Sequence, residues 1–210
     1  SSKAPKSSKA PKSSKAPKSA GRRSLTGQSP ERTGSHNVVV GDYHEYSSYG
    51  GIVTGSKNAI EVMYGAVIGG VDNVAAGDYS AIMGGHGNEA IGVRSTVVGG
   101  YTNSAEGRTA TVSGGEENVA SGLSSSVSGG EYCYAVGEYS SVSGGYDNYA
   151  TGQFSSVSGG YINQADGGYS SILGGEKNFA TGTASSVSGG KNNWADGEYS
   201  SILGGEDSIA

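Results

Sequence analysis

The residues best suited to chemistry lie close together near the beginning of the chain, at His36, Asp42, His44 and Glu45. Two imidazoles and two carboxylates at this spacing could bind a metal ion or take part in acid–base catalysis. No second pair of ligands accompanies them, and they lie where a repeat array begins, a place where terminal caps are normally irregular. We therefore expect no catalytic residue, no metal site and no cofactor here.

Other common sites lack their sequence signatures. Cys133 is the only cysteine, so the chain cannot form an internal disulfide. No basic residue lies beside Cys133 to stabilise a thiolate, which makes it a poor nucleophile. The aspartates fall at different positions of the repeat described below, whereas calcium-binding solenoids need one in every coil. The glycines precede no helix, so we do not expect a phosphate-binding loop.

A repeat must position any functional side chain. Glycine accounts for 39 of the 210 residues, and its pairs recur ten times at intervals of 15 residues between positions 69 and 205. A Val or Ile precedes each pair by two residues and an Ala follows it by five, in a unit S-S-V-S-G-G-x-x-N-x-A-x-G-x-Y. Such fixed columns predict inward side chains stacked on their copies in neighbouring coils. Alternation around Val142 and Ala150 predicts two short strands per coil, with glycines at the corners.

The fold class predicted from this pattern is all-β, a parallel β-solenoid with 15-residue coils after a disordered Lys/Ser/Pro tail. Residues 1–35 form the expected cationic tail, which contains three SSKAPK repeats. Residues 36–62 form irregular first coils or a cap, and residues 63–210 form the regular coils. No stretch is long and apolar enough for a membrane span, and no signal peptide is visible.

Asparagine recurs three residues after the glycine pairs. At coil spacing, stacked amides can hydrogen-bond to their copies above and below, so we expect a structural ladder. Cys133 occupies the same column and is interpreted as a small substitute for asparagine. The ladder residues are Asn73, Asn88, Asn103, Asn118, Asn148, Asn163, Asn178 and Asn193.

The charge of the chain is divided between a basic tail and an acidic body. Residues 1–32 contain nine basic residues and one acid, a net charge of +8; the remaining 5 basic and 18 acidic residues give −13. The tail is interpreted either as a solvated linker or as an anchor for anionic polysaccharide, mineral or matrix. The acidic body argues against specific nucleic-acid binding. The candidate polyanion-binding residues are Lys3, Lys6, Lys9, Lys12, Lys15, Lys18, Arg22 and Arg23.

Two columns of the repeat could form interaction surfaces. Aromatic residues before the double serine could stack on sugar rings or on a partner, or could shield the corners of the roll. These are Tyr64, Tyr79, Tyr139, Phe154, Tyr169 and Tyr199. The position just before the glycine pair should point outward, and it is apolar in several coils, which suggests that another chain covers that face. These candidate contacts are Ile68, Met83, Val98, Leu173 and Leu203.

The unit S-V-S-G-G-x-x-N-x-A-x-G resembles the head repeat of trimeric autotransporter adhesins of the YadA type, over about residues 36–210. The resemblance implies a left-handed parallel β-roll in which three chains pack around a common axis. This sequence departs from that pattern because its period is 15, Gly replaces the second aliphatic and Asn replaces the first Ala. Gly41 and Gly55 keep the shorter spacing of 14 residues. The stalk and membrane barrel of that family have no counterpart here.

The function expected from these observations is an extracellular or cell-surface structural and adhesive module, homotrimeric and without catalysis. The alternative is an ice-binding solenoid, because Ser126/Ser128 and their copies form a regular hydroxyl grid. Scarce threonine in that grid argues against the alternative. A catalytic β-helix acting on polysaccharide would need clustered acids on one face, and the sequence has no such cluster.

Overall fold

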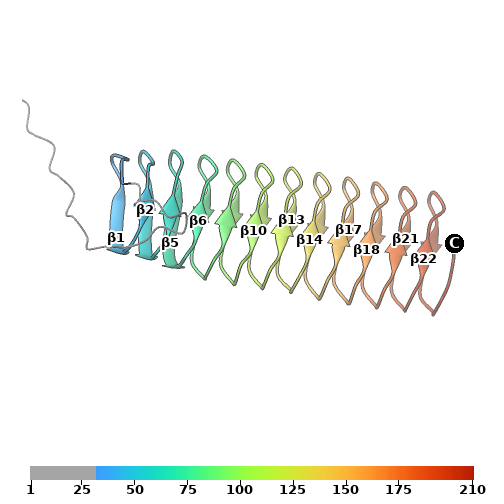
Figure 1. Cartoon of the computed structure of the whole chain (residues 1–210). Coiled ribbons are helices and arrows are strands. Elements are labelled where there is room, and N and C mark those ends of the chain that lie inside the picture. The colour runs from blue at the N-terminus through green and yellow to red at the C-terminus, as the bar shows by residue number, and fades with distance from the viewer. Residues whose placement is uncertain (1–31) are drawn as a thin grey trace, which may run out of the picture.

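The computed structural model describes residues 32–210, which form a parallel β-solenoid without helices. Its strands form two parallel sheets, one of 12 strands and one of 11, and successive strands alternate between the sheets. Figure 1 shows the coils side by side in one row, from the N-terminal coil in blue to the C-terminal coil in red. The predicted all-β solenoid with 15-residue coils is confirmed, whereas the handedness of the coil stays a prediction.

The strands are short because each coil makes a corner every few residues. The first sheet contains β1 (Val38–Asp42), β3 (Ile52–Ser56), β5 (Ala66–Val71), β7 (Ala81–Ile82), β9 (Thr96–Val97), β11 (Thr111–Val112), β13 (Ser126–Val127), β15 (Ser141–Val142), β17 (Ser156–Val157), β19 (Ser171–Ile172), β21 (Ser186–Val187) and β23 (Ser201–Ile202). The second contains β2 (Glu45–Tyr46), β4 (Ala59–Ile60), β6 (Val74–Ala75), β8 (Glu89–Ala90), β10 (Ser104–Ala105), β12 (Val119–Ala120), β14 (Tyr134–Ala135), β16 (Tyr149–Ala150), β18 (Gln164–Ala165), β20 (Phe179–Ala180) and β22 (Trp194–Ala195).

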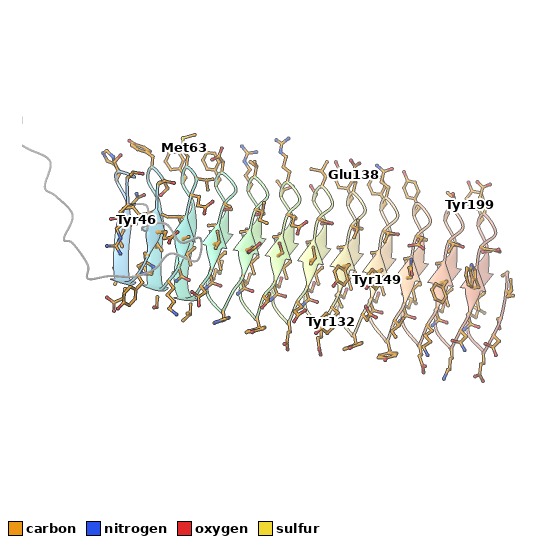
Figure 2. The ribbon with its side chains drawn as sticks, in the orientation of Figure 1. Tyr46, Met63, Tyr132, Glu138, Tyr149 and Tyr199 are labelled. Carbon is orange, nitrogen blue, oxygen red and sulfur yellow. The ribbon has the colours of Figure 1, made fainter. Side chains whose placement is uncertain are left out.

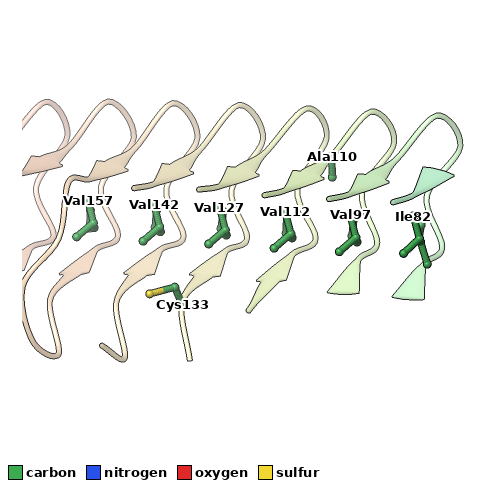
Figure 3. Close-up of a cluster of buried hydrophobic side chains, with 14 of the residues drawn as sticks. Ile82, Val97, Ala110, Val112, Val127, Cys133, Val142 and Val157 are labelled. Carbon is green, nitrogen blue, oxygen red and sulfur yellow. The ribbon is translucent and has the colours of Figure 1, made fainter. Parts of the chain in front are cut away.

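The hydrophobic core is a thin layer between the two sheets. One Val or Ile of the first sheet and one Ala of the second are buried in each regular coil. Figure 3 shows the side chains of the first column, from Ile82 to Val157, repeated at the same place in successive coils. A serine column lies beside this core, and Ala110 replaces the serine in one coil. Eight of these buried hydroxyls, such as that of Ser140, have no hydrogen-bond partner among the described residues.

The asparagine column is completely buried, and its hydrogen bonds differ from a simple amide stack. The side-chain oxygen of Asn163 accepts the backbone N–H of Asn178 in the next coil at 3.0 Å. Its side-chain nitrogen donates to the carbonyls of Gly159 and Gly175, each at 3.0 Å. Direct contact between side-chain amides occurs at only some steps, such as Asn163 to Asn148 at 3.2 Å. Each asparagine therefore satisfies buried backbone groups of two glycine corners.

Cys133 interrupts this column. Its own N–H donates to the side-chain oxygen of Asn118 at 2.9 Å, as an asparagine would. On its other side, Asn148 has only the sulfur of Cys133 as a neighbour, and sulfur is a weak acceptor. Burial is the largest of the effects that raise the pKa of the Cys133 thiol, so the thiol stays protonated at neutral pH.

The first coils have the same architecture with one residue fewer. β1 and β3 pair with an offset of 14 residues, and the offset changes to 15 within the pairing of β3 with β5, between Ile68 and Val71. The residue added there belongs to the glycine pair Gly69–Gly70. The 15-residue coil is thus a 14-residue coil with one residue inserted at a corner, which leaves both inward columns in phase. Arg32 and Ser35, placed in the tail by sequence, already bridge to Tyr46 and Tyr49.

The corners depend on glycine less than the sequence suggests. A side chain on Gly145, the second of its pair, would overlap the carbonyl of Gly160, and its φ is 91°. The first glycine of a pair, such as Gly129, has open space where a side chain would be. Each coil instead contains two further positions in the left-handed region, and 22 non-glycine residues have φ between 51° and 61° there. Because Tyr, Arg, Thr, Ser, Asp and Lys all occur at these positions, no residue type announces them.

The asparagine column generates a paired prediction. Asn163→Ala removes the acceptor of the Asn178 N–H and the donor of two buried carbonyls, so the free energy of unfolding should fall by about 2–4 kcal/mol. Cys133→Asn supplies the missing acceptor to Asn148 and should raise it by about 1 kcal/mol. Denaturant unfolding of both variants measures this. A loss of stability in Cys133→Asn would contradict the proposed role of the column.

Candidate binding surfaces

The solenoid has two outer sheet faces and two edges of corners on which a partner could bind. Figure 2 shows Met63, Glu138 and Tyr199 at one edge and Tyr132 at the opposite edge. We call the first the aromatic edge, because it contains the sequence-predicted column from Tyr64 to Tyr199. The second, made by the two residues that follow each glycine pair, is called the acidic edge.

The six aromatic residues predicted as a ladder occupy left-handed corner positions and do not form one continuous stack. Tyr139, Phe154 and Tyr169 stack in sequence, with ring centroids 5.0 Å apart and planes within 11°. Tyr64 and Tyr79 form a separate stacked pair at 5.2 Å. Arg94, Thr109 and Ser124 separate the two groups, and Ala184 separates Tyr169 from Tyr199. Residue identity within one column thus decides where stacking occurs.

Two more sets of rings stack in the same way. On the acidic edge, His86 stacks on Tyr101 and Tyr146 on Tyr161, at 5.2 and 5.3 Å. On the outer face of the second sheet, Tyr134 stacks on Tyr149 at 4.8 Å and Phe179 on Trp194 at 5.0 Å. The sequence analysis missed this last column. The outward position between the buried Asn and Ala of each coil is the signal that could have identified it.

Stacking along the solenoid axis limits what these rings can bind. Neighbouring coils cover the ring faces within each stack, so the stack presents ring edges to solvent. Binding a sugar ring against an aromatic face requires a free face, which only the terminal ring of a stack retains. The geometry therefore favours corner shielding and coil-to-coil packing over a continuous sugar-binding platform.

Tyr149 also has a polar contact on this face. Burial, a hydrogen bond to Asp147 and the negative charge of Asp147 raise its pKa to about 12. The hydroxyl therefore remains protonated at neutral pH and donates to the Asp147 carboxylate. This contact ties the acidic edge to the second sheet.

The outer face of the first sheet changes character along the solenoid. In the first five strands its outward side chains are mostly apolar, and Val38, Ile68 and Met83 are each more than half exposed. In the middle coils the same two columns hold serines, such as Ser141 and Ser143 on either side of Val142. Leu173 and Leu203 interrupt the serines near the C-terminal end, with exposures of 62% and 85%.

The structure separates the residues that looked most reactive in sequence. His44 is buried in the asparagine column, where its Nδ1 accepts the N–H of Asn58 at 3.2 Å and its Nε2 lies 3.1 Å from the carbonyl oxygen of Val40. This pattern assigns the proton to Nε2. His36 lies against the ring of Tyr49 instead, with centroids 4.8 Å apart. Within residues 32–210, no three His, Cys, Asp or Glu side chains are grouped as a metal site.

The eight tail cations from Lys3 to Arg23 lie outside the described residues, so their proposed role stays a prediction. In the part of the chain that the structure describes, no helix has the length and apolar character needed to cross a membrane. No protein-family model matches the chain, and no curated protein matches it either.

The stacked rings generate a prediction about stability. Phe154→Ala removes two stacking contacts, so the free energy of unfolding should fall by about 1–3 kcal/mol. Tyr199→Ala is the matched control, because Tyr199 occupies the same column next to Ala184 and is 74% exposed. Its effect should stay below about 0.5 kcal/mol. Equal effects of the two substitutions in chemical unfolding would contradict a packing role for the stacks.

Proposed function

We propose that this chain is a structural and adhesive repeat module that assembles side by side with copies of itself as a homotrimer. Its role is to present surfaces on a rigid rod, without catalysis. The observation that supports this most is the exposed apolar face of the first sheet. Ile68, Met83 and Val98 lie at successive coils and are 56%, 53% and 40% exposed.

This face extends beyond the column that suggested it. Val38, Val40 and Ile52, in β1 and β3, add exposed apolar area next to Ile68. A contiguous apolar face of this kind is unusual on a monomer and typical of a protein–protein interface. The thin core gives a second reason, because a single row of Val and Ala per coil buries little surface for each residue ordered.

The resemblance to trimeric adhesin heads supports the same assembly. The repeat differs from the 14-residue unit of that family in length, and the structure confines the extra residue to one corner. The first two coil offsets are 14 residues. A side-by-side trimer needs an outward sheet face in register along the axis, which both coil lengths provide.

The surroundings we propose are extracellular or at the cell surface, where the basic tail would bind anionic polysaccharide, mineral or matrix. The charge separation of the chain supports this, since the tail and the body have opposite signs. The ligand follows from charge alone, so the class is polyanionic and its identity is open.

The trimer is tested by native mass spectrometry of the wild-type chain and of Ile68→Ser/Met83→Ser/Val98→Ser. Serine occupies this column in the middle coils, so the repeat itself accepts the substitution. The wild type should be a trimer and the variant should dissociate. The control Met63→Ser/Ile91→Ser/Val93→Ser removes three other exposed apolar residues of neighbouring coils and should remain trimeric. A monomeric wild type, or a variant that stays trimeric, would rule out this interface.

An ice-binding role is the second candidate, supported by the hydroxyl rows of the first sheet. Ser126, Ser141 and Ser156 pair in register, and Thr96 and Thr111 extend the same column. A flat parallel sheet repeats these hydroxyls at about 4.8 Å. This candidate predicts thermal hysteresis, lost when Ser141 and Ser143 are both changed to Lys. Freezing behaviour equal to that of an inert protein at high concentration would eliminate it.

A further inference from the structure

The acidic edge concentrates negative charge on one side of the solenoid. Parallel bridges join the first residue of each of its corners to the next, so side chains in neighbouring coils lie about 4.8 Å apart. Lys177 and Lys191 are its only lysines, and it has no arginine. Its carboxylates are Asp72, Glu116, Glu117, Glu131, Asp147, Glu176, Glu206 and Asp207.

The middle of this edge lacks counter-charges. Glu176 forms ion pairs with Lys177 at 3.6 Å and with Lys191 at 3.3 Å. Among the described residues, Glu116, Glu117 and Glu131 have neither an ion pair nor a side-chain hydrogen bond. We call these three residues the central acidic cluster.

The central acidic cluster affects its surroundings. The pKa of the Tyr132 hydroxyl is raised, first by the charge of Glu117 and then by desolvation and by Glu131. Carboxylates held one coil apart repel each other, and a cation placed between them would relieve that repulsion. The corner therefore favours a positively charged occupant.

The N-terminal sequence contains cations at a spacing that fits this edge. Lysine recurs at every third residue from Lys3 to Lys18, with a proline in each six-residue unit. A polyproline II segment has three residues per turn and rises about 3.1 Å per residue, which would place these lysines on one side about 9 Å apart. Two coils of the solenoid rise about 9.6 Å. Carboxylates recur at that two-coil interval, at Glu116, Asp147, Glu176 and Glu206.

We propose that the segment from Lys9 to Lys18 binds along the acidic edge of its own chain, with Lys18 at the central acidic cluster and Lys9 near Glu206. In this arrangement Lys15 lies opposite Asp147 and Lys12 opposite Glu176. The segment then runs from the C-terminal end of the solenoid back toward its first coil.

The length of the connecting segment permits this arrangement. Five coil steps separate Asp42 from Glu116 in the same column, a distance of about 24 Å. The 13 residues between Lys18 and Arg32 can span about 40 Å when extended. The link leaves slack, and a link of this length holds the two partners at an effective concentration in the millimolar range.

The contact is electrostatic and therefore sensitive to salt. An exposed ion pair contributes about 0–1 kcal/mol, so several pairs acting together are needed to hold the segment. At about 1 M salt the screening length falls to about 3 Å, and the segment should dissociate. Lysines held at this edge are withheld from outside polyanions, so an anionic matrix would have to displace the segment. This contact depends on neither the trimer nor the matrix role.

Energy transfer between two dyes on the full chain tests the contact. Cys133→Asn leaves only introduced thiols, and Ser8→Cys with Asn192→Cys places dyes on the segment and on the acidic edge. Transfer should be high at low salt and lose most of its efficiency in about 1 M NaCl. Ser8→Cys with Thr183→Cys, on the aromatic edge, is the matched control and should give lower transfer.

Charge substitutions test the location of the contact. Glu116→Gln/Glu117→Gln/Glu131→Gln should reduce transfer, whereas Asp78→Asn/Glu138→Gln/Glu198→Gln, the same charge change on the aromatic edge, should preserve it. Equal transfer in both triple variants, or transfer insensitive to salt in the unsubstituted edge, would overturn the proposal. Loss of transfer on mixing with excess unlabelled chain would show a contact between chains and overturn the placement within one chain.

Discussion

The hydrogen bonds of the buried asparagines hold each coil to the next, and the rest of the solenoid depends on them. A coil this short has corners made of closely packed backbone, and their buried carbonyl and N–H groups need partners. One asparagine per coil supplies an acceptor to the following coil and donors to two glycine carbonyls. Where His44 replaces asparagine, its ring nitrogens face Asn58 and Val40 in a similar way.

This stacking determines the surfaces as well as the core. Because every side chain lies over its copy in the next coil, a favourable residue repeated in one column becomes a row and an unfavourable one becomes a row of repulsions. Rows of rings stack and turn their edges outward. Rows of valine and alanine form the core, and rows of serine form a polar face. Rows of glutamate at the acidic edge need counter-charges from elsewhere.

The features predictable from sequence were those that repeat by residue type. The period, the two inward columns of Val142 and Ala150, and the buried asparagines follow directly from the alternation and spacing of residues. The left-handed corner positions did not, because Tyr139 and Asp147 have nothing in common by residue type and only the backbone places them there. His44 looked like a candidate ligand because its column, set by a 14-residue offset, is visible only once the coils are paired. The surfaces were predictable as columns, while the orientation of the rings depends on contacts between coils.

Hydrogen exchange at the asparagine backbone amides is the most direct test of the corner that holds the coils together. The amides of Asn103, Asn163 and Asn178 donate to side-chain oxygens of the preceding coil, so they should exchange as slowly as the most protected amides of the chain. The amide of Asn148, which faces the sulfur of Cys133, should exchange faster than these three. Equal exchange at all four positions, or exchange as fast as in exposed turns, would contradict the role assigned to the asparagine column.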